Sequence, residues 1–216
     1  MIAALVPAKA LDLAKGRLAA LLSEDDRRRL ALAMLEDILR ALQSVPRLHT
    51  VSVVSPDAAV LDRARAMDAE AILEPGSVRG INQALSHALH LMSPRPDALL
   101  VVLADVPAVT GPEIDSILDA LPDGPGVVIC PSHDRGTSAL ALRPPEVIPF
   151  RFGPQSFPAH KREAAARAIP NQVLRIDSLF RDIDGPDDLR QLLERPAETA
   201  THVLLAQLRI AERVGG

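Results

Sequence analysis

The chain has 216 residues, of which 48% are hydrophobic and 24% charged, and this size suits one α/β domain with a substantial core. The net charge of −4 and the 2% aromatic content, with no Trp or Tyr, exclude a general nucleic-acid binder with aromatic stacking platforms. The single cysteine, Cys130, excludes an internal disulfide framework. Since no signal peptide or membrane-length apolar run is evident, we expect a cytoplasmic protein with no membrane partner.

Apolar runs alternate with helical spacings along the chain, and prolines mark the ends of most apolar runs. In chain order, these patterns predict strand Ile2–Pro7, helix Ser23–Ser44, strand Thr50–Val54, helix Ala58–Met67, strand Ala71–Leu73, helix Gly80–Met92, strand Ala98–Ala104, helix Pro112–Leu121, strands Gly126–Cys130 and Ser138–Leu142, and helices Ser156–Ala168, Pro186–Leu193 and Thr201–Arg213. This alternation is typical of an α/β fold whose mostly parallel sheet carries helices on both faces. Ligands of such sheets bind beyond the carboxyl ends of the strands, so the loops there are candidate functional segments.

The loop after the first strand carries three cations, Lys9, Lys15 and Arg17. Lys offers a point charge and Arg a forked set of donors, and this combination suits phosphate oxygens. A solvated basic loop is the alternative. Because the loop follows the end of a strand, where ligands of such sheets bind, phosphate binding and the alternative are equally favoured.

Two acidic positions border predicted elements. Asp105 follows the apolar run that ends at Ala104, and Asp184 comes just before the helix that starts at Pro186. A turn residue and a helix cap are the respective alternatives. Because Mg²⁺ prefers one or two carboxylates plus substrate phosphates, these acids and the basic loop together favour metal-assisted phosphate chemistry.

Two later segments supply neutral hydrogen-bond donors. The polar segment 132–138 includes Thr137 and Ser138, and an ordinary hairpin loop is its alternative. The segment 150–160 contains three of the four phenylalanines, which indicates a structured loop. We expect Ser156 to cap a helix whose free N–H groups form an anion site, with simple capping and packing as the alternative.

Taken in order, these segments resemble one family of guanylyltransferases, which act on small phosphorylated acids in deazaflavin coenzyme (F-420) biosynthesis. The matching segments are VPAK, AKGRL, ADVP, GTSAL, FGPQSFPAH and DIDGPDDL, and they extend from Ile2 to about Leu193. The resemblance implies a three-layer nucleotidyltransferase fold of glycosyltransferase-A type, in one domain over residues 1–216. The tail 194–216 is unmatched, and we assign it to packing or to dimerisation.

The resemblance also implies the reaction and the residues that carry it. The acceptor phosphate would attack the α-phosphorus of GTP and release pyrophosphate, with Mg²⁺ held by Asp105 and Asp184. GTP would be bound by Lys9, Lys15, Arg17, Gly80 and Asn82, the first three of which would also neutralise charge in the transition state. An acceptor phosphate is mostly dianionic at neutral pH, so this reaction needs no general base.

For the phosphorylated acid, the resemblance implies binding by Thr137, Gly153 and Ser156. Arg135 and Ser138 replace a glycine and an asparagine common in the family, which leaves the acceptor open among phosphoenolpyruvate, 2-phospho-L-lactate and 3-phosphoglycerate. The alanine- and arginine-rich composition favours phosphoenolpyruvate.

Two other interpretations stay open at this point. One is a nucleotidyltransferase of the same fold that acts on a sugar phosphate or a pterin phosphate. The other is a non-catalytic nucleotide-binding subunit, although a subunit that only binds has no need of paired acids. Two macromolecular partners also stay open: a second copy of the chain, and the downstream transferase that takes the activated product.

Overall fold

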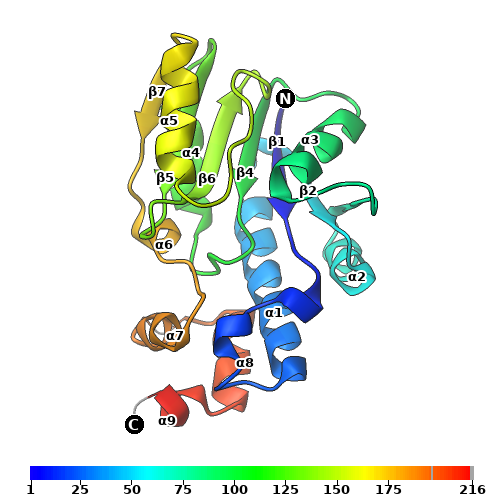
Figure 1. The fold of residues 1–216 in the computed structure, drawn as a ribbon, viewed down its shortest axis with the longest axis vertical. Helices are drawn as coiled ribbons and strands as arrows, with labels where there is room; N and C mark the ends of the chain where they lie inside the picture. Colours follow the sequence, from blue (N-terminus) through cyan, green and yellow to red (C-terminus); the bar gives the residue numbers. More distant parts are fainter. Residues whose placement is uncertain (196, 215–216) are drawn as a thin grey trace.

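The computed structural model describes residues 1–195 and 197–214 (Figure 1). Its strands are β1 (Ile2–Pro7), β2 (Leu48–Ser55), β3 (Glu70–Leu73), β4 (Ala98–Val102), β5 (Gly126–Pro131), β6 (Thr137–Arg143) and β7 (Asn171–Val173). Its helices are α1 (Glu24–Gln43), α2 (Ala58–Ala66), α3 (Ile81–Leu91), α4 (Gly111–Ala120), α5 (Ser156–Ala166), α6 (Asp177–Phe180), α7 (Pro186–Leu193), α8 (Ala200–Gln207) and α9 (Ile210–Val214), with 3-10 turns at Leu11–Leu13 and Gly16–Leu18. The predicted α/β alternation is therefore confirmed.

The strands form one seven-stranded sheet in the order β3-β2-β1-β4-β6-β5-β7. The pairs β1–β2, β1–β4, β2–β3 and β5–β7 are parallel, while β6 runs antiparallel to both β4 and β5. The predicted mostly parallel sheet is thus confirmed, with one reversed strand. That reversal follows from the short connection between β5 and β6, where the carboxylate of Asp134 accepts the N–H of Gly136 at 2.8 Å.

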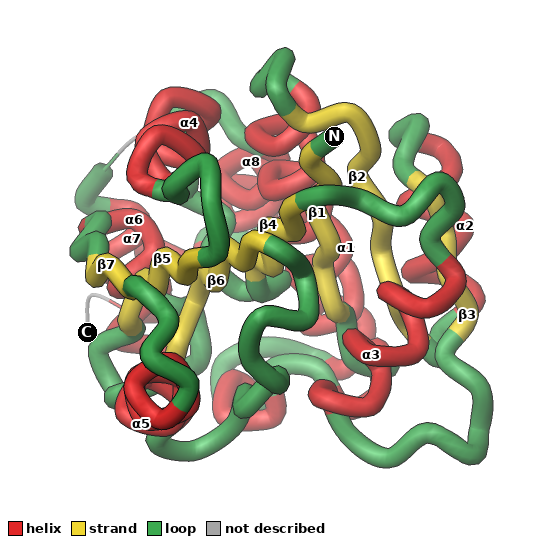
Figure 2. The backbone as a smooth tube through the Cα atoms, turned by 90° about the horizontal axis from the view of Figure 1, so that it is seen from above, coloured by secondary structure: helices red, strands yellow, loops and turns green. Residues whose placement is uncertain are grey.

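Helices cover both faces of the sheet, which gives three layers (Figure 2). On one face, α1, α2, α4 and α6 enclose a core built from Leu, Ile, Val and Ala side chains. On the other face, α3, α5 and the segment around Phe150 and Phe152 enclose a second core. Cys130 is fully buried in the first core, and burial raises the pKa of its thiol to about 12, so Cys130 packs as a structural thiol.

Local capping explains where several helices begin. The hydroxyl of Ser23 accepts the N–H of Asp26 at 3.1 Å, which confirms the predicted start of α1. The expectation that Ser156 caps α5 is wrong: the cap position is Gln155, whose backbone is left-handed, and Ser156 is the first helical residue. Its side chain is consequently not used on the N–H groups of its own helix turn, and Ser156 lines a cleft instead.

The tail folds back onto the domain as two helices, and the single helix expected over Thr201–Arg213 is interrupted. The break lies at Arg209, which has a left-handed backbone with φ of 51°. Leu204, Leu205 and Ile210 are buried in a third core that α1 and α7 share. The tail thus packs against the domain, as Figure 1 shows beside α1. Among the described residues, no helix is long and apolar enough to cross a membrane.

Candidate active site

A cleft of about 520 Å³ opens at the carboxyl ends of β1 and β4. Eight of the ten residues predicted to carry function line it, so most of the predicted site is brought together. These eight are Lys9, Lys15, Gly80, Asp105, Thr137, Gly153, Ser156 and Asp184. The other two, Arg17 and Asn82, lie beside the cleft and contact it through neighbours.

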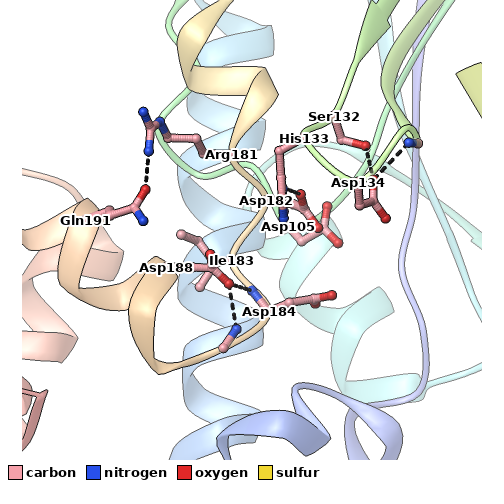
Figure 3. Close-up of polar contacts among 12 residues, drawn as sticks. Asp105, Ser132, His133, Asp134, Arg181, Asp182, Ile183, Asp184, Asp188 and Gln191 are labelled. Atoms are coloured by element: carbon pink, nitrogen blue, oxygen red, sulfur yellow. Dashed lines mark hydrogen bonds and ion pairs between the residues drawn. The ribbon is translucent and has the colours of Figure 1, made fainter.

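Three aspartates meet on one wall of the cleft. Asp105, Asp182 and Asp184 each present a carboxylate oxygen, and these oxygens all lie within 4.8 Å of one another (Figure 3). The backbone holds them there, because the N–H of Ile183 donates to the Asp105 carbonyl at 2.9 Å. The cluster therefore joins the loop after β4 to the segment before α7.

The start of α7 fixes the third acid. Asp188 accepts the backbone N–H groups of Asp184 and Gly185 at 2.9 and 2.7 Å. Ile183 is buried in the core below, as its position between two acids predicts. With its backbone held from both sides, Asp184 keeps its side chain on the cleft wall.

Burial disfavours the ionised form of two acids of the cluster. Burial raises the pKa of Asp105 above its ordinary value, and the Asp184 carboxylate adds to that rise while the Lys15 ammonium opposes it. Burial also raises the pKa of Asp182, with the Asp105 carboxylate as the next cause. Such shifts show that further positive charge would stabilise the ionised cluster.

Two carboxylate oxygens of the cluster make no hydrogen bond within the described part of the chain. The Oδ1 atoms of Asp105 and Asp182 are buried and have no hydrogen-bond partner among the described residues. His133 Nδ1 lies 3.0 Å from Asp182 Oδ1 but outside hydrogen-bond geometry. Because unpaired buried oxygens of this kind are the donors that hard divalent cations take, the cluster fits a metal ion.

Lys15 reaches into the acidic cluster from the loop after β1. Its backbone is left-handed, with φ of 51°, and its side chain is 9% exposed. Its Nζ donates to the Ile183 carbonyl and lies 3.5 Å from Asp184 Oδ1 and 3.9 Å from Asp105 Oδ2. Lys15 thus places a cation at the boundary between the acids and the open cleft.

The other two cations of this loop have different environments. Arg17 lies 3.6 Å from Asp184 Oδ2, and 80% of its side chain is exposed. Lys9 lines the cleft, is exposed, and makes no ion pair with a described residue. Both side chains can turn toward an anion in the cleft with little loss of existing contacts.

A second part of the cleft lining, here called the hydroxyl wall, presents hydroxyl groups. Thr137, Ser138 and Ser156 line it, and each is at most 2% exposed. The Ser138 hydroxyl has no hydrogen-bond partner among the described residues, and the Thr137 hydroxyl contacts His160 Nδ1 at 3.0 Å. Gly153, with φ of 125°, occupies a backbone conformation that favours glycine and brings its main chain to the cleft.

Asn82 holds this wall in place. Its amide accepts the N–H of Phe152 at 2.7 Å and donates to the Phe152 carbonyl at 2.9 Å. Both ends of the amide are therefore used on the backbone next to Gly153. Asn82 therefore positions this backbone, and its predicted contact with a nucleotide stays a prediction.

Two residues of the site, Asp182 and His160, are not among the predicted ones. Asp182 lies two positions before Asp184, and alternation across the buried Ile183 is a signal that both acids face one side. His160 ends the FGPQSFPAH segment, but its contacts with residues 137 and 151 come from tertiary folding. No local pattern predicts those contacts.

Comparison with known sequences gives a consistent answer over nearly the whole chain. A family model described as "Guanylyl transferase CofC like" matches residues 2–214. The phosphoenolpyruvate guanylyltransferase of Sphaerobacter thermophilus is 44% identical over 88% of this chain and 91% of its own. The 3-phospho-D-glycerate guanylyltransferase of Colwellia psychrerythraea is 34% identical over 87% and 89%, and the 2-phospho-L-lactate guanylyltransferase of Methanothermobacter thermautotrophicus is 32% identical over 95% and 90%.

Comparison with solved structures supports the fold. A nucleotide-diphospho-sugar transferase from Desulfovibrio desulfuricans superimposes with a TM-score of 0.75, over 99% of this chain and 97% of that one, at 17% identity. The predicted nucleotidyltransferase fold is thereby confirmed. At this identity the likeness concerns the fold alone.

Proposed function

The chain belongs to the CofC-like guanylyl transferase family, and from this premise we propose that it transfers GMP from GTP to the phosphate of phosphoenolpyruvate. The observation that carries the proposal is the cleft itself, whose lining combines an acidic cluster, a lysine and a set of hydroxyl groups. One wall suits a metal-bound triphosphate and the other suits a small anion. A transferase that joins two phosphates needs both.

In the proposed reaction, an oxygen of the acceptor phosphate forms a bond to the α-phosphorus of GTP. The bond from that phosphorus to the oxygen bridging to the β-phosphorus breaks, and pyrophosphate leaves with the bonding electron pair. The acceptor phosphate is already ionised, since its second pKa is about 6, so no residue has to remove a proton. The protein must instead hold two anions together and neutralise their repulsion.

Asp105, Asp182 and Asp184 would hold Mg²⁺, because their clustered carboxylate oxygens, two of which are buried without a hydrogen-bond partner among the described residues, offer the donor set that this ion prefers. When bound, the ion would supply positive charge to the phosphate oxygens. Lys15, beside the same acids, would carry part of this charge on the protein. Lys9 and Arg17, the more exposed cations, would bind the outer phosphates of GTP.

The acceptor would lie against the hydroxyl wall, with Thr137 and Ser156 donating to its phosphate or carboxylate and Gly153 allowing close approach. The base and ribose would lie toward Gly80, where α3 begins. We favour phosphoenolpyruvate as the acceptor because the relative at 44% identity is named for it, whereas those named for the other two acids are 34% and 32% identical.

Pyrophosphate release tests this proposal directly. The protein is incubated with GTP, Mg²⁺ and either phosphoenolpyruvate, 2-phospho-L-lactate or 3-phosphoglycerate in separate reactions. We expect release with phosphoenolpyruvate at least ~10-fold faster than with either other acid. Faster release with another acid would reassign the acceptor, and silence from folded protein in all three reactions would exclude the proposed function.

A further inference from the structure

A hydrogen-bonded chain of three residues, Thr137, His160 and Arg151, runs behind the hydroxyl wall. His160 on α5 is fully buried, and its Nδ1 lies 3.0 Å from the Thr137 hydroxyl. On the other side of the ring, the backbone N–H of Arg151 donates to His160 Nε2 at 3.0 Å. The imidazole thus connects the start of β6 to the loop that presents Gly153.

The direction of these hydrogen bonds follows from the Arg151 contact. A backbone N–H can only donate, so Nε2 must accept and cannot carry a proton. The proton of the neutral ring is then on Nδ1, and it must be donated to the Thr137 oxygen. Burial supports this state, because it lowers the pKa of His160 to about 4 and keeps the ring neutral at ordinary pH.

The direction matters to the ligand because Thr137 has one proton to give. If that proton were donated to His160, the Thr137 oxygen would present only lone pairs to the cleft and would repel a phosphate or carboxylate. With Nδ1–H donating inward, the hydroxyl proton has no partner among the described residues and is free to point into the cleft.

We infer that His160 is a positioning residue, whose Nδ1–H tautomer turns the Thr137 hydroxyl into a hydrogen-bond donor for the phosphorylated acid. The inference rests on the proposed function, since it assigns Thr137 to the acceptor. It goes beyond that function by giving a role to a residue that does not contact the substrate itself. The ring packs edge-on against Phe152, with centroids 5.0 Å apart, which fixes its orientation.

Histidine nitrogen NMR tests the tautomer without any turnover. His202 in α8 provides an internal control, because its Nδ1 also contacts a threonine hydroxyl, that of Thr199, at 2.9 Å. Its Nε2, however, faces the carbonyls of Leu192 and Arg195, which only accept, so His202 must carry its proton on Nε2. We expect His160 and His202 in wild-type protein to show opposite tautomers, and an Nε2–H signal from His160 would overturn the inference.

Two substitutions separate the two contacts of the ring. His160→Asn keeps a donor at the distance of Nδ1 and loses the contact with Arg151, whereas His160→Gln keeps an acceptor at the distance of Nε2 and loses the donor to Thr137. We expect His160→Gln to raise the KM for the acid about 10-fold, with His160→Asn much closer to wild type and the KM for GTP unchanged in both. His202→Gln is the matched control and should leave both KM values unchanged.

A double-mutant cycle with Thr137→Val completes the test. Since His160 acts through Thr137, His160→Gln should raise the acid KM no further once the hydroxyl is gone. Full additivity, or equal effects of His160→Gln and His160→Asn, would show that His160 only supports the loop. Absence of pyrophosphate release from wild-type protein would instead contradict the proposed function, and the tautomer would still be read from the spectrum.

Discussion

The three aspartates of the cleft have different surroundings, but their carboxylates together form one cluster that could hold a metal ion. We expect Asp105→Asn and Asp182→Asn each to lower kcat by about 10²-fold or more, because each removes a buried, unpaired oxygen from the cluster. Pyrophosphate release measured over a range of Mg²⁺ concentrations gives the readout. Asp187→Asn is the control, since Asp187 is exposed on α7 and pairs with Arg190 outside the cleft. Full activity of Asp182→Asn would remove that residue from the cluster.

At this scale, sequence predicts a residue when its neighbours in the chain determine its place. Asp105 and Asp184 are predictable because one follows an apolar strand and the other precedes a helix. Asp182 joins them only when its segment folds against the loop after β4. Asn82 is a second example, because nothing in its neighbouring sequence indicates that its amide pairs with the backbone of Phe152.

Among the elements, α8 depends on a cap from a distant helix. Asp37, buried in the middle of α1, accepts the N–H groups of Ala200 and Thr201 at 2.8 and 2.9 Å. Asp37→Ala should therefore lower the free energy of unfolding by about 1–3 kcal/mol, because one buried and one part-buried donor lose their acceptor. Urea unfolding measures this change, with Asp62→Ala, which removes an exposed ion pair with Arg65, expected within about 0.5 kcal/mol of wild type. Equal stabilities would contradict the capping role.

Elements with strong periodicity are predictable, and short ones are not. The helix starting after Ser23 and the apolar run from Ala98 were both recognised, although β4 ends at Val102. The strand β7 was missed because its three residues are all exposed and only their pairing with β5 makes them a strand. The break at Arg209 was missed because a left-handed arginine leaves no signal in the hydropathy pattern.

At the scale of the whole molecule, the titrations of His160 and Asp105 change the stability of the fold in opposite directions. His160 is neutral in the folded state with a pKa of about 4, whereas an unfolded histidine has 6.5. Between these values the unfolded state binds more protons, so stability falls as pH decreases from 6.5 to 4. Asp105 has a raised pKa, so the folded state takes up its proton first and regains stability on acidification.

Because the two contributions to stability have opposite signs, substitutions of His160 and of Asp105 should change its pH dependence in opposite directions. The full His160 contribution is about 3 kcal/mol, so His160→Gln should lose much less stability than wild type between pH 7 and pH 5. Asp105→Asn, which lacks the acid with the raised pKa, should lose more stability once the pH falls into the range in which Asp105 takes up its proton. Glu163 and Arg151 also face His160, and neither is changed in these variants. Guanidinium unfolding over a pH series from 7 to 4 measures the differences, and an identical pH dependence in all three proteins would show that neither His160 nor Asp105 controls acid stability.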